Sequence, residues 1–363
     1  MAGRGKKKKK GSTLRRVGRG LYWVLVGLSA VIVALFIAVK LISQRPEMGE
    51  TQRPADPQTV TSTAPGEEGG QDQPQTPALE RKDATWTFLL CAEDQVSGST
   101  DTIMVCTYDT VNQKIGLVSV PRDTLVDRSG WKYHKINAAY AAGNTYDPPD
   151  GGIAQLQAAV SEVLGIPIDH YVKIDTKLFV AIVDAVGGVD CNVPVHMSYD
   201  DPTQDLHIHY EPGVQHLTGR QALEVVRCRK NSDGEGEYPN NIYDAYPDAD
   251  IGRTRTQQEM VKAIAKKILS NPQKVGQYVE ILSQYVKTDL SLGNLLWFAG
   301  PALEFNFDDL TTATLPGDGS KSYKGTDWVY ELDIQGSLDI INHCLNPYTT
   351  PVTADMVRMV RAD

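Results

Sequence analysis

Two aspartates and an arginine lie at the ends of three consecutive strand-like segments. The segments are short runs rich in branched and apolar residues, at positions 88–91, 103–108 and 115–120. Asp94 follows the first run, Asp101 precedes the second, and Arg122 follows the third after a proline that ends the strand. If the first two strands are neighbours, both carboxylates lie at one sheet edge, where they are suited to hold a hard cation beside an arginine. This pattern indicates a site for a phosphate ester.

A second group of candidate residues lies within positions 222–259. Arg227 and Arg229 are two residues apart, so their side chains would point the same way if this segment is a strand. Arg253 and Gln257 are four residues apart in the first turns of a predicted helix, and they therefore share one of its faces. The start of that helix also offers free backbone N–H groups and the positive end of its dipole. Three arginines beside a helix start would bind a pyrophosphate, because guanidinium groups bind phosphate oxygens in pairs.

Each of these groups also has an ordinary structural explanation. Acids in a loop between strands are most often turn formers. Arginines at such spacings are common on protein surfaces, where water solvates them. Only the joint occurrence of both groups, in this order, favours a binding site.

Composition and charge limit the classes of partner. The chain has 363 residues and a hydrophobic fraction of 41%, enough to fill a core. Positions 1–45 contain eleven basic and no acidic residues, so the remaining 25 basic and 45 acidic residues give that part of the chain a net charge of −20. Such an acidic domain is a poor candidate for general nucleic-acid binding. Any anion must therefore be held by local arginines.

The amino-terminal region has the pattern of a membrane anchor. Positions 21–39 contain no charged residue, and at about 1.5 Å per residue this run is about as long as a bilayer core is thick. We predict a transmembrane helix at 21–42, with the basic segment 1–20 in the cytoplasm and the rest of the chain outside. A cleaved signal peptide is the alternative, but the run is long and no small-residue cleavage site follows before Pro46. Positions 43–82 contain six prolines and no aromatic residue, which predicts a disordered extracellular linker.

From position 83 to 363, helical and strand patterns alternate without an obvious boundary. Helical periodicity or capping signals occur at 153–164, 178–186, 218–224, 251–269, 275–285, 290–299 and 334–344, and further strand patterns at 171–174 and 189–193. Thr218 and Asp250 are the predicted N-caps of their helices. The alternation predicts an α/β fold in which a mixed central sheet is sandwiched between helices, as an α/β/α domain. An acidic stretch at 232–249 is predicted to be an inserted surface loop.

The five cysteines do not suggest a disulfide framework. Their number is odd, and Cys91, Cys106 and Cys191 fall in apolar strand-like runs. Buried free thiols are the favoured interpretation. A bond between Cys91 and Cys106 is left open.

Three histidines lie in an acidic stretch and are candidate ligands of a transition metal. His207 and His209 share a face if the segment is extended, and His216 follows further along the chain. No tight ligand spacing joins His216 to the other two. Solvated loop histidines are therefore favoured over a zinc site.

The ordered series of motifs resembles the LytR-CpsA-Psr family of membrane-anchored cell-wall enzymes. The matching pieces are FLLCAED, the DT of STDTIMV, SVPRD, KINAAYAAG, GIPIDHYVKID, VDAVGGVDCNVP, HLTGRQALEVVRCRK and DIGRTRTQQ. The resemblance extends from about position 83 to the end. The basic start, the single uncleaved signal-anchor span and the linker are also similar to the layout of that family.

The resemblance implies a magnesium-dependent phosphotransferase of Gram-positive cell-wall biogenesis. Such an enzyme moves a glycopolymer, for example teichoic acid, from a polyprenyl-pyrophosphate carrier onto peptidoglycan through a phosphodiester, outside the cell membrane. By position, Asp94 and Asp101 would hold Mg²⁺. The pyrophosphate would be bound by Arg122, Arg227, Arg229, Arg253 and Gln257. Asp101, Arg122 and Asp250 would act in catalysis, with Asp250 either orienting Arg253 or accepting the proton of the sugar hydroxyl.

One departure from the family pattern leaves two other functions open. Ser99 stands where the family usually has an arginine two residues before its second aspartate, and the loop between the two acids is short. A hydrolase that cleaves the same pyrophosphate with water would use every donor contact of the transferase. A non-catalytic module that binds wall polymer or regulates from the membrane is the third possibility, and Ser99 is the feature that favours it.

Overall fold

The computed structural model describes residues 42–49, 79–93, 100–128, 132–146, 151–202, 206–232, 245–248 and 250–362. The predicted basic segment 1–20, the span 21–42 except Ile42, and most of the linker 43–82 lie outside these ranges. Within them, no helix is both long and apolar enough to cross a membrane. The described residues divide into two units: 47–290 with 301–362, and 42–46 with 291–300.

The larger unit is built on a mixed six-stranded sheet with the strand order β10-β3-β2-β1-β4-β9. The neighbours β1–β2, β2–β3 and β4–β9 are antiparallel, whereas β1–β4 and β10–β3 are parallel. The strands are β1 (Thr85–Glu93), β2 (Thr100–Asp109), β3 (Lys114–Ser119), β4 (His170–Ile174), β9 (Lys287–Thr288) and β10 (Leu310–Thr314). This confirms the predicted mixed sheet and the first three predicted strands.

The hydrophobic pattern of β1 and β2 explains their place in the centre of the sheet. Leu89 and Cys91 of β1 and Ile103 and Val105 of β2 alternate with other residues and point into one core cluster. Cys91 lies opposite Ile103 in the antiparallel register. The end of β1 is therefore next to the start of β2, as the proposed pairing of Asp94 with Asp101 requires.

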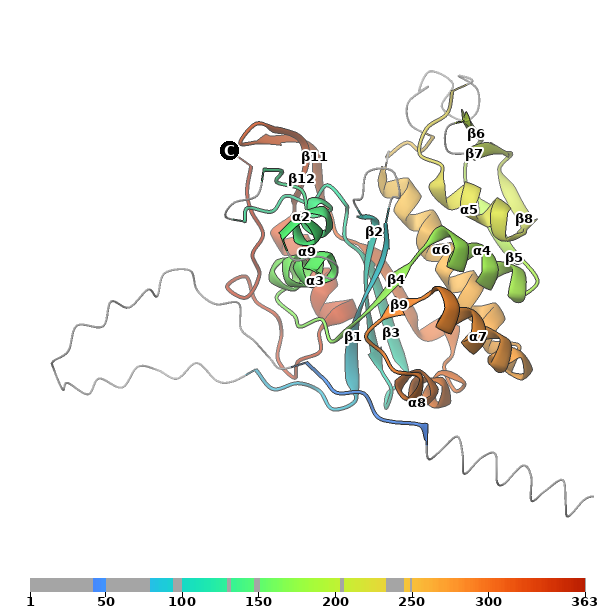
Figure 1. Ribbon diagram of the computed structural model, residues 1–363. Helices are drawn as coiled ribbons and strands as arrows, with labels where there is room; N and C mark the ends of the chain where they lie inside the picture. Colours follow the sequence, from blue (N-terminus) through green and yellow to red (C-terminus); the bar gives the residue numbers. More distant parts are fainter. Residues whose placement is uncertain are drawn as a thin grey trace, which may run out of the picture. The chain divides into compact units, whose positions relative to one another are not determined.

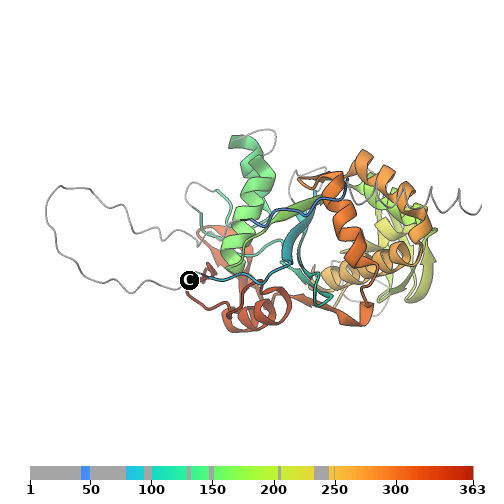
Figure 2. The ribbon, with the colours of Figure 1, turned by 90° about the horizontal axis from the view of Figure 1, so that it is seen from below.

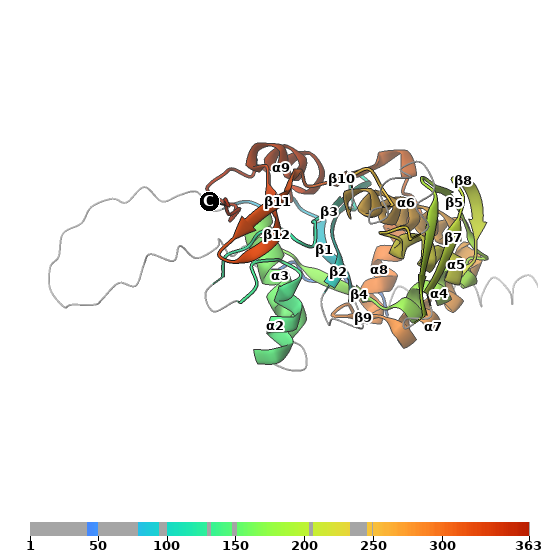
Figure 3. The ribbon, with the colours of Figure 1, turned by 90° about the horizontal axis from the view of Figure 1, so that it is seen from above.

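Helices cover both faces of this sheet, which confirms the α/β/α arrangement (Figures 1 and 3). On one face lie α2 (Ala138–Tyr146), α3 (Gly151–Leu164) and α9 (Ile334–Ile340). The other face carries α4 (Thr176–Ala185), α5 (Gly219–Arg227), α6 (Asp250–Leu269) and α7 (Val275–Tyr285). Figure 2 shows the same layering from below, with α3 and α9 on one side of the strands and α6 on the other. Apolar residues of α3, such as Leu156, Val160 and Val163, complete the core on the first face.

A second core lies among α4, α5, α6 and two short hairpin sheets. These sheets pair β5 (Val189–Val193) with β8 (Gly213–Leu217) and β6 (Met197–Asp201) with β7 (Leu206–Tyr210). The predicted strand at 189–193 is confirmed, but it pairs outside the central sheet. Its buried side chains Val189, Cys191 and Val193 pack with apolar residues of α5 and α6. The histidine-containing segment is strand as well, not loop.

Local signals placed most helix ends correctly. Thr218 is the N-cap of α5, and its backbone N–H donates to Gln221 Oε1 at 3.0 Å. Gly187 and Gly188, which follow α4, have φ values of 86° and 82°, a conformation that favours glycine. The predicted helix at 334–344 is divided into α9 and a π-helical turn, Ile341–Leu345. A hairpin of β11 (Gly317–Tyr323) and β12 (Thr326–Leu332) completes the larger unit.

The described end of the predicted linker belongs to the folded domain. Arg81 donates to both carboxylate oxygens of Asp169 at 2.6 and 2.7 Å, and the side chain of Asp169 is fully buried. Asp169 also accepts from the backbone N–H of Thr87 in β1 at 2.8 Å. This ion pair ties residues just before β1 to the segment before β4, a contact that the linker composition did not predict.

The smaller unit consists of residues 42–46 and most of α8 (Leu292–Ala302). Backbone and side-chain bonds join its two segments. Gln44 N–H donates to Gly293 O, and Asn294 Nδ2 donates to Gln44 O, each at 3.1 Å. The predicted helix at 290–299 is confirmed with its ends shifted by a few residues.

Candidate active site

The start of β2 and the end of β3 bring Asp101 and Arg122 into contact. Asp101 is the second residue of β2, and Arg122 follows Pro121 beyond the end of β3. Because the two strands are antiparallel neighbours, these ends lie at the same edge of the sheet. Arg122 Nη1 donates to Asp101 Oδ1 at 2.7 Å, a charge-assisted hydrogen bond.

The first turn of α6 adds an aspartate and a second arginine to this edge. Arg253 Nη2 lies 2.9 Å from Asp250 Oδ1 and donates to the backbone oxygen of Asp101. Arg122 Nε lies 3.4 Å from the other oxygen of Asp250. Asp250 was predicted to cap α6, and this is wrong: it is the first helical residue, and its carboxylate contacts the two guanidinium groups. Asp101, Arg122, Asp250 and Arg253 therefore form one cluster.

The surroundings shift the pKa of the two arginines in opposite directions. Burial opposes the charge of Arg122, but the carboxylates of Asp250, Asp101 and Asp123 raise its pKa above the usual value. The side chain of Arg253 is only 6% exposed. Its burial lowers its pKa, and the nearby charges of Arg122 and Arg229 act in the same direction, while Asp250 opposes them. Compared with Arg122, the guanidinium group of Arg253 is therefore less exposed to solvent, and it is repelled by two nearby arginines.

Both guanidinium groups keep an unused donor. The Nε atoms of Arg122 and Arg253 are buried and make no hydrogen bond with any described residue. A buried donor without a partner costs about 1–3 kcal/mol. An anion bound beside the two guanidinium groups would relieve the repulsion between the two cations.

Gln257 and the two other predicted arginines lie around the end of α5. Gln257 Nε2 donates to the backbone oxygen of Val226 at 3.3 Å, so α6 is joined to the last turn of α5. Arg227 is the last residue of that helix and Arg229 lies two residues beyond it. The condition under which the two side chains would point the same way, a strand at this segment, is not met, because the buried face of Ala222, Val225 and Val226 continues the helix to Arg227. The charge of Arg229 is nevertheless close enough to lower the pKa of Arg253.

Two charged residues beside the cluster were not predicted as site residues. Asp123 Oδ2 lies 3.6 Å from Arg122 Nε, and Asp123 Oδ1 lies 3.1 Å from Lys135 Nζ. Lys135 is brought there by a backbone bridge between it and Leu125. Both residues belong to quoted motifs, SVPRD and KINAAYAAG, and this was the only signal that could have identified them.

A buried lysine near the end of β4 also escaped prediction. Lys173 is 8% exposed, donates to Tyr140 Oη and lies 4.6 Å from the centre of that ring. It is level with Cys91 of β1 in the parallel register, close to the end of that strand. The signal was a charged residue at a core-facing position of the strand pattern YVKI.

The structure describes only one of the two aspartates that were predicted to bind a cation. Asp94 lies outside the described residues, as does Ser99. Asp101 gives one oxygen to Arg122, and its side chain is 37% exposed, so its second oxygen is accessible. Carboxylate oxygens are the ligands that Mg²⁺ prefers. The donor present at Asp101 therefore fits such an ion.

The other candidates for metal or thiol chemistry lie in different surroundings. His207 and His209 share a face of β7, and both contact Asp200, at 2.7 and 3.2 Å, whereas His216 of β8 contacts Asp190 at 2.8 Å. Within the described ranges no group of three or more His, Cys, Asp or Glu residues is suited to a metal ion. All five cysteines are free, which confirms the predicted thiols and excludes the Cys91–Cys106 bond.

The chain is similar in sequence to a known protein family and to curated relatives. A family model described as the LytR_cpsA_psr family matches residues 56–343. A polyisoprenyl-teichoic acid–peptidoglycan teichoic acid transferase TagU of Bacillus mycoides is 30% identical over 277 residues, covering 74% of this chain and 80% of the relative. A TagU of Bacillus anthracis is 32% identical over 265 residues, covering 70% of this chain and 76% of the relative.

A solved structure agrees with the fold. The crystal structure of Bacillus subtilis TagV is 25% identical to this chain and superposes with a TM-score of 0.57. It covers 71% of this chain and 95% of the TagV chain. The α/β/α architecture is thus shared with a solved structure over most of both chains.

Proposed function

The chain belongs to the LytR_cpsA_psr family, and from this membership we propose that it transfers a glycopolymer, such as teichoic acid, from a polyprenyl-pyrophosphate carrier onto peptidoglycan. The observation that supports this reaction most directly is the convergence of Arg122 and Arg253 on Asp250, beside Asp101. Two guanidinium groups so placed match the charge and the oxygens of a diphosphate.

The reaction is a phosphoryl transfer with a sugar hydroxyl as the nucleophile. The hydroxyl oxygen forms a bond to the phosphorus that carries the glycopolymer. The bond from that phosphorus to the bridging oxygen breaks, and polyprenyl phosphate leaves. The product is a phosphodiester between the glycopolymer and peptidoglycan. This chemistry needs charge neutralisation and alignment more than a covalent intermediate.

Each residue of the cluster has a role that follows from its contacts. Arg122 and Arg253 bind the phosphate oxygens and neutralise the charge that develops on them. Asp250 holds both arginines, and its Oδ1 accepts no hydrogen bond of good geometry from a described residue. The carboxylate of Asp250, which orients the two arginines, is the proposed acceptor of the proton of the attacking hydroxyl. Arg227, Arg229 and Gln257 extend the binding site toward the end of α5.

Magnesium is part of the proposal, with Asp101 and Asp94 as its protein ligands. The accessible second oxygen of Asp101 is the structural support for it. A bound Mg²⁺ would add positive charge beside the phosphate oxygens. The anchor at 21–42 and an extracellular location of the domain are likewise proposed, on the charge-free run 21–39 and the basic segment before it.

The test is transfer by the full-length protein in detergent micelles, given a phosphorus-labelled polyprenyl-pyrophosphate glycopolymer with and without peptidoglycan fragments. We expect label in peptidoglycan for the wild type and a loss of about 10²–10³-fold for Arg253→Ala, as for the removal of one key charge-stabilising donor. The control Arg220→Ala removes an exposed arginine paired with Glu224 and should retain activity.

Two results would count against the transferase. Release of label into water at the same rate with and without peptidoglycan would show a hydrolase. Unchanged function of Arg122→Ala and Arg253→Ala in cells would show a binding or regulatory module.

A further inference from the structure

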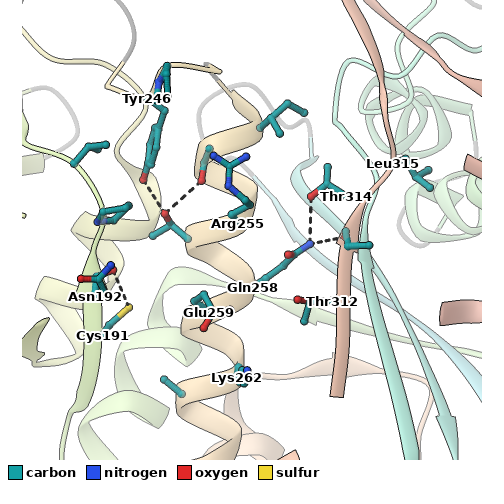
Figure 4. Close-up of a pocket in the computed structure, with 18 of the residues that line it drawn as sticks. Cys191, Asn192, Tyr246, Arg255, Gln258, Glu259, Lys262, Thr312, Thr314 and Leu315 are labelled. Atoms are coloured by element: carbon teal, nitrogen blue, oxygen red, sulfur yellow. Dashed lines mark hydrogen bonds between the residues drawn. The ribbon is translucent and has the colours of Figure 1, made fainter. Parts of the chain in front are cut away.

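A groove of about 1010 Å³ runs along α6, on a face that carries neither Arg253 nor Gln257. Its floor is formed by the helix positions from Ile251 to Lys266 (Figure 4). At a rise of about 1.5 Å per residue these positions extend over about 22 Å. The groove is thus an elongated site, suited to a chain more than to a compact small molecule.

The two walls of the groove are strands with an unpaired edge. One wall is β5, with Cys191 and Asn192, and the other is β10, with Thr312 and Thr314 (Figure 4). Among the strands that the structure describes, β10 pairs only with β3 and β5 only with β8. The lining includes no residue of β3 or β8, so the groove lies on the open side of both strands. An edge strand presents backbone N–H and C=O groups that an extended peptide can pair with.

The floor carries unpaired charges of both signs. Glu259, Lys262 and Lys266 make no ion pair within the ranges that the structure describes, whereas Arg255 is neutralised by Asp248 at 2.5 Å. Their spacing of three and four residues places them on one face of α6. A polyanion would be repelled by Glu259, but a chain that carries carboxylates and an ammonium group would match both signs.

The groove begins next to the candidate active site. Ile251 and Gly252 of its lining directly follow Asp250. Tyr330, which also lines it, donates its backbone N–H to Asp123 O at 2.7 Å, and Tyr330 forms a bridge with Thr124. The start of the groove therefore lies one residue beyond Asp250 along α6 and beside the segment that carries Asp123, although the groove opens on a different face of the helix from Arg253.

We propose that this groove binds the short peptide attached to the peptidoglycan acceptor, extended along the free edges of β5 and β10. The inference rests on the proposed function, because it assigns the groove to the acceptor of that reaction. At about 3.3 Å per residue, the floor accommodates an extended peptide of about six residues. The groove thereby holds the peptide while the sugar hydroxyl of the same acceptor lies at the arginine cluster.

The test compares two acceptors with the full-length protein. One is a glycan fragment that carries its peptides, and the other is the same fragment after an amidase has removed them. We expect the double variant Lys262→Glu, Lys266→Glu to raise the KM for the peptide-bearing fragment about tenfold, because two favourable charge contacts become repulsive. The KM for the stripped fragment and the kcat for both should not change.

Two further variants separate the groove from general effects. Thr312→Trp places a large ring against the groove wall without a change in charge, and it should raise the same KM. Lys114→Glu makes one such Lys→Glu change, half the charge change of the double variant, at an exposed residue of β3 outside the groove, and it should have no effect. Equal KM values for the two fragments with the wild type would overturn the proposal.

Direct binding distinguishes a failure of this inference from a failure of the proposed function. A fluorescent muramyl peptide is titrated against the wild type and the double variant, and its anisotropy is followed. A loss of about tenfold in affinity for the variant would support the groove even if no transfer occurs. Unchanged affinity for the muramyl peptide, together with lost affinity for inorganic polyphosphate, would show a polyanion site and overturn the proposal.

Discussion

Asp250 contacts both guanidinium groups, so a neutral residue at this position should uncover the repulsion between them. We expect Asp250→Asn to lower the free energy of unfolding by about 2 kcal/mol, because a largely buried cation loses its partner. The more positive site should also bind anions more tightly. Inorganic pyrophosphate should therefore raise the Tm of Asp250→Asn more than that of the wild type. Differential scanning fluorimetry with a pyrophosphate titration measures both effects.

The control for this prediction is Asp339→Asn, the same change at an exposed residue of α9. It should leave both the Tm and its response to pyrophosphate as in the wild type. An equal pyrophosphate response for Asp250→Asn and the wild type would show that the carboxylate does not restrain the two arginines as an anion-binding pair.

Individual site residues were predictable where a strand or helix end fixed their position. Asp101, Arg122 and Arg253 lie at such ends, and the structure brings them together. The end of α5 was predicted near Glu224, but the buried face of the helix continues to Arg227, so the strand considered for Arg227 and Arg229 does not form. The ion pair of Asp123 with Lys135 depends on the isolated β-bridge between Leu125 and Lys135, which no local sequence pattern predicts.

At the scale of elements, α6 keeps its place against the sheet through one glutamine. Gln258 is 4% exposed, and its Nε2 donates to Ser119 Oγ at 2.8 Å and to Ala313 O at 2.6 Å. We expect Gln258→Ala to lower the free energy of unfolding by about 1–3 kcal/mol, because it leaves these buried acceptors without their donor. Transfer activity should fall with it, since α6 carries Asp250 and Arg253. Urea unfolding and kcat measure the two effects.

Gln273→Ala is the matched control, since Gln273 is exposed just before α7. It should change neither quantity. If Gln258→Ala unfolds like the wild type but loses activity, the glutamine acts on the site without holding the helix.

Elements with a regular apolar period were predictable, and those without one were not. The apolar period of α3 and α4 gave their ranges to within a few residues. β11 reads GDGSKSY and is exposed at all positions but the last, so hydrophobic alternation gives no signal for it. Such a strand forms because β12 pairs with it. The residues of the segment alone do not reveal that partner.

At the scale of the whole molecule, alternation of helix and strand patterns predicted the α/β/α fold, since an alternating order buries a sheet between helices. It did not predict that β5 leaves the central sheet to pair with β8. The one buried face of β5 packs in a cluster with α5 and α6, and its local sequence does not show whether it joins the central sheet or pairs with β8.

The reactivity of the free thiols tests how tightly the whole domain is packed. Burial raises the pKa of Cys106 and Cys228 to about 12. At pH 8 the reactive thiolate of such a group is on the order of one molecule in ten thousand. We expect iodoacetamide to label these two cysteines slowly in the native protein. Raising the pH toward 12 should speed the labelling, because it ionises the thiol, and mass spectrometry measures the rate at each site.

The control is the same labelling in urea, where both thiols meet water and return to an ordinary pKa of about 8.5. They should then react much faster. Because all five cysteines are free, dithiothreitol should also leave the Tm unchanged. A lower Tm with dithiothreitol would mean that a disulfide supports the fold. Fast native labelling of Cys228, which is fully buried beside Tyr246 and Met260 in the second core, would mean that this core opens readily.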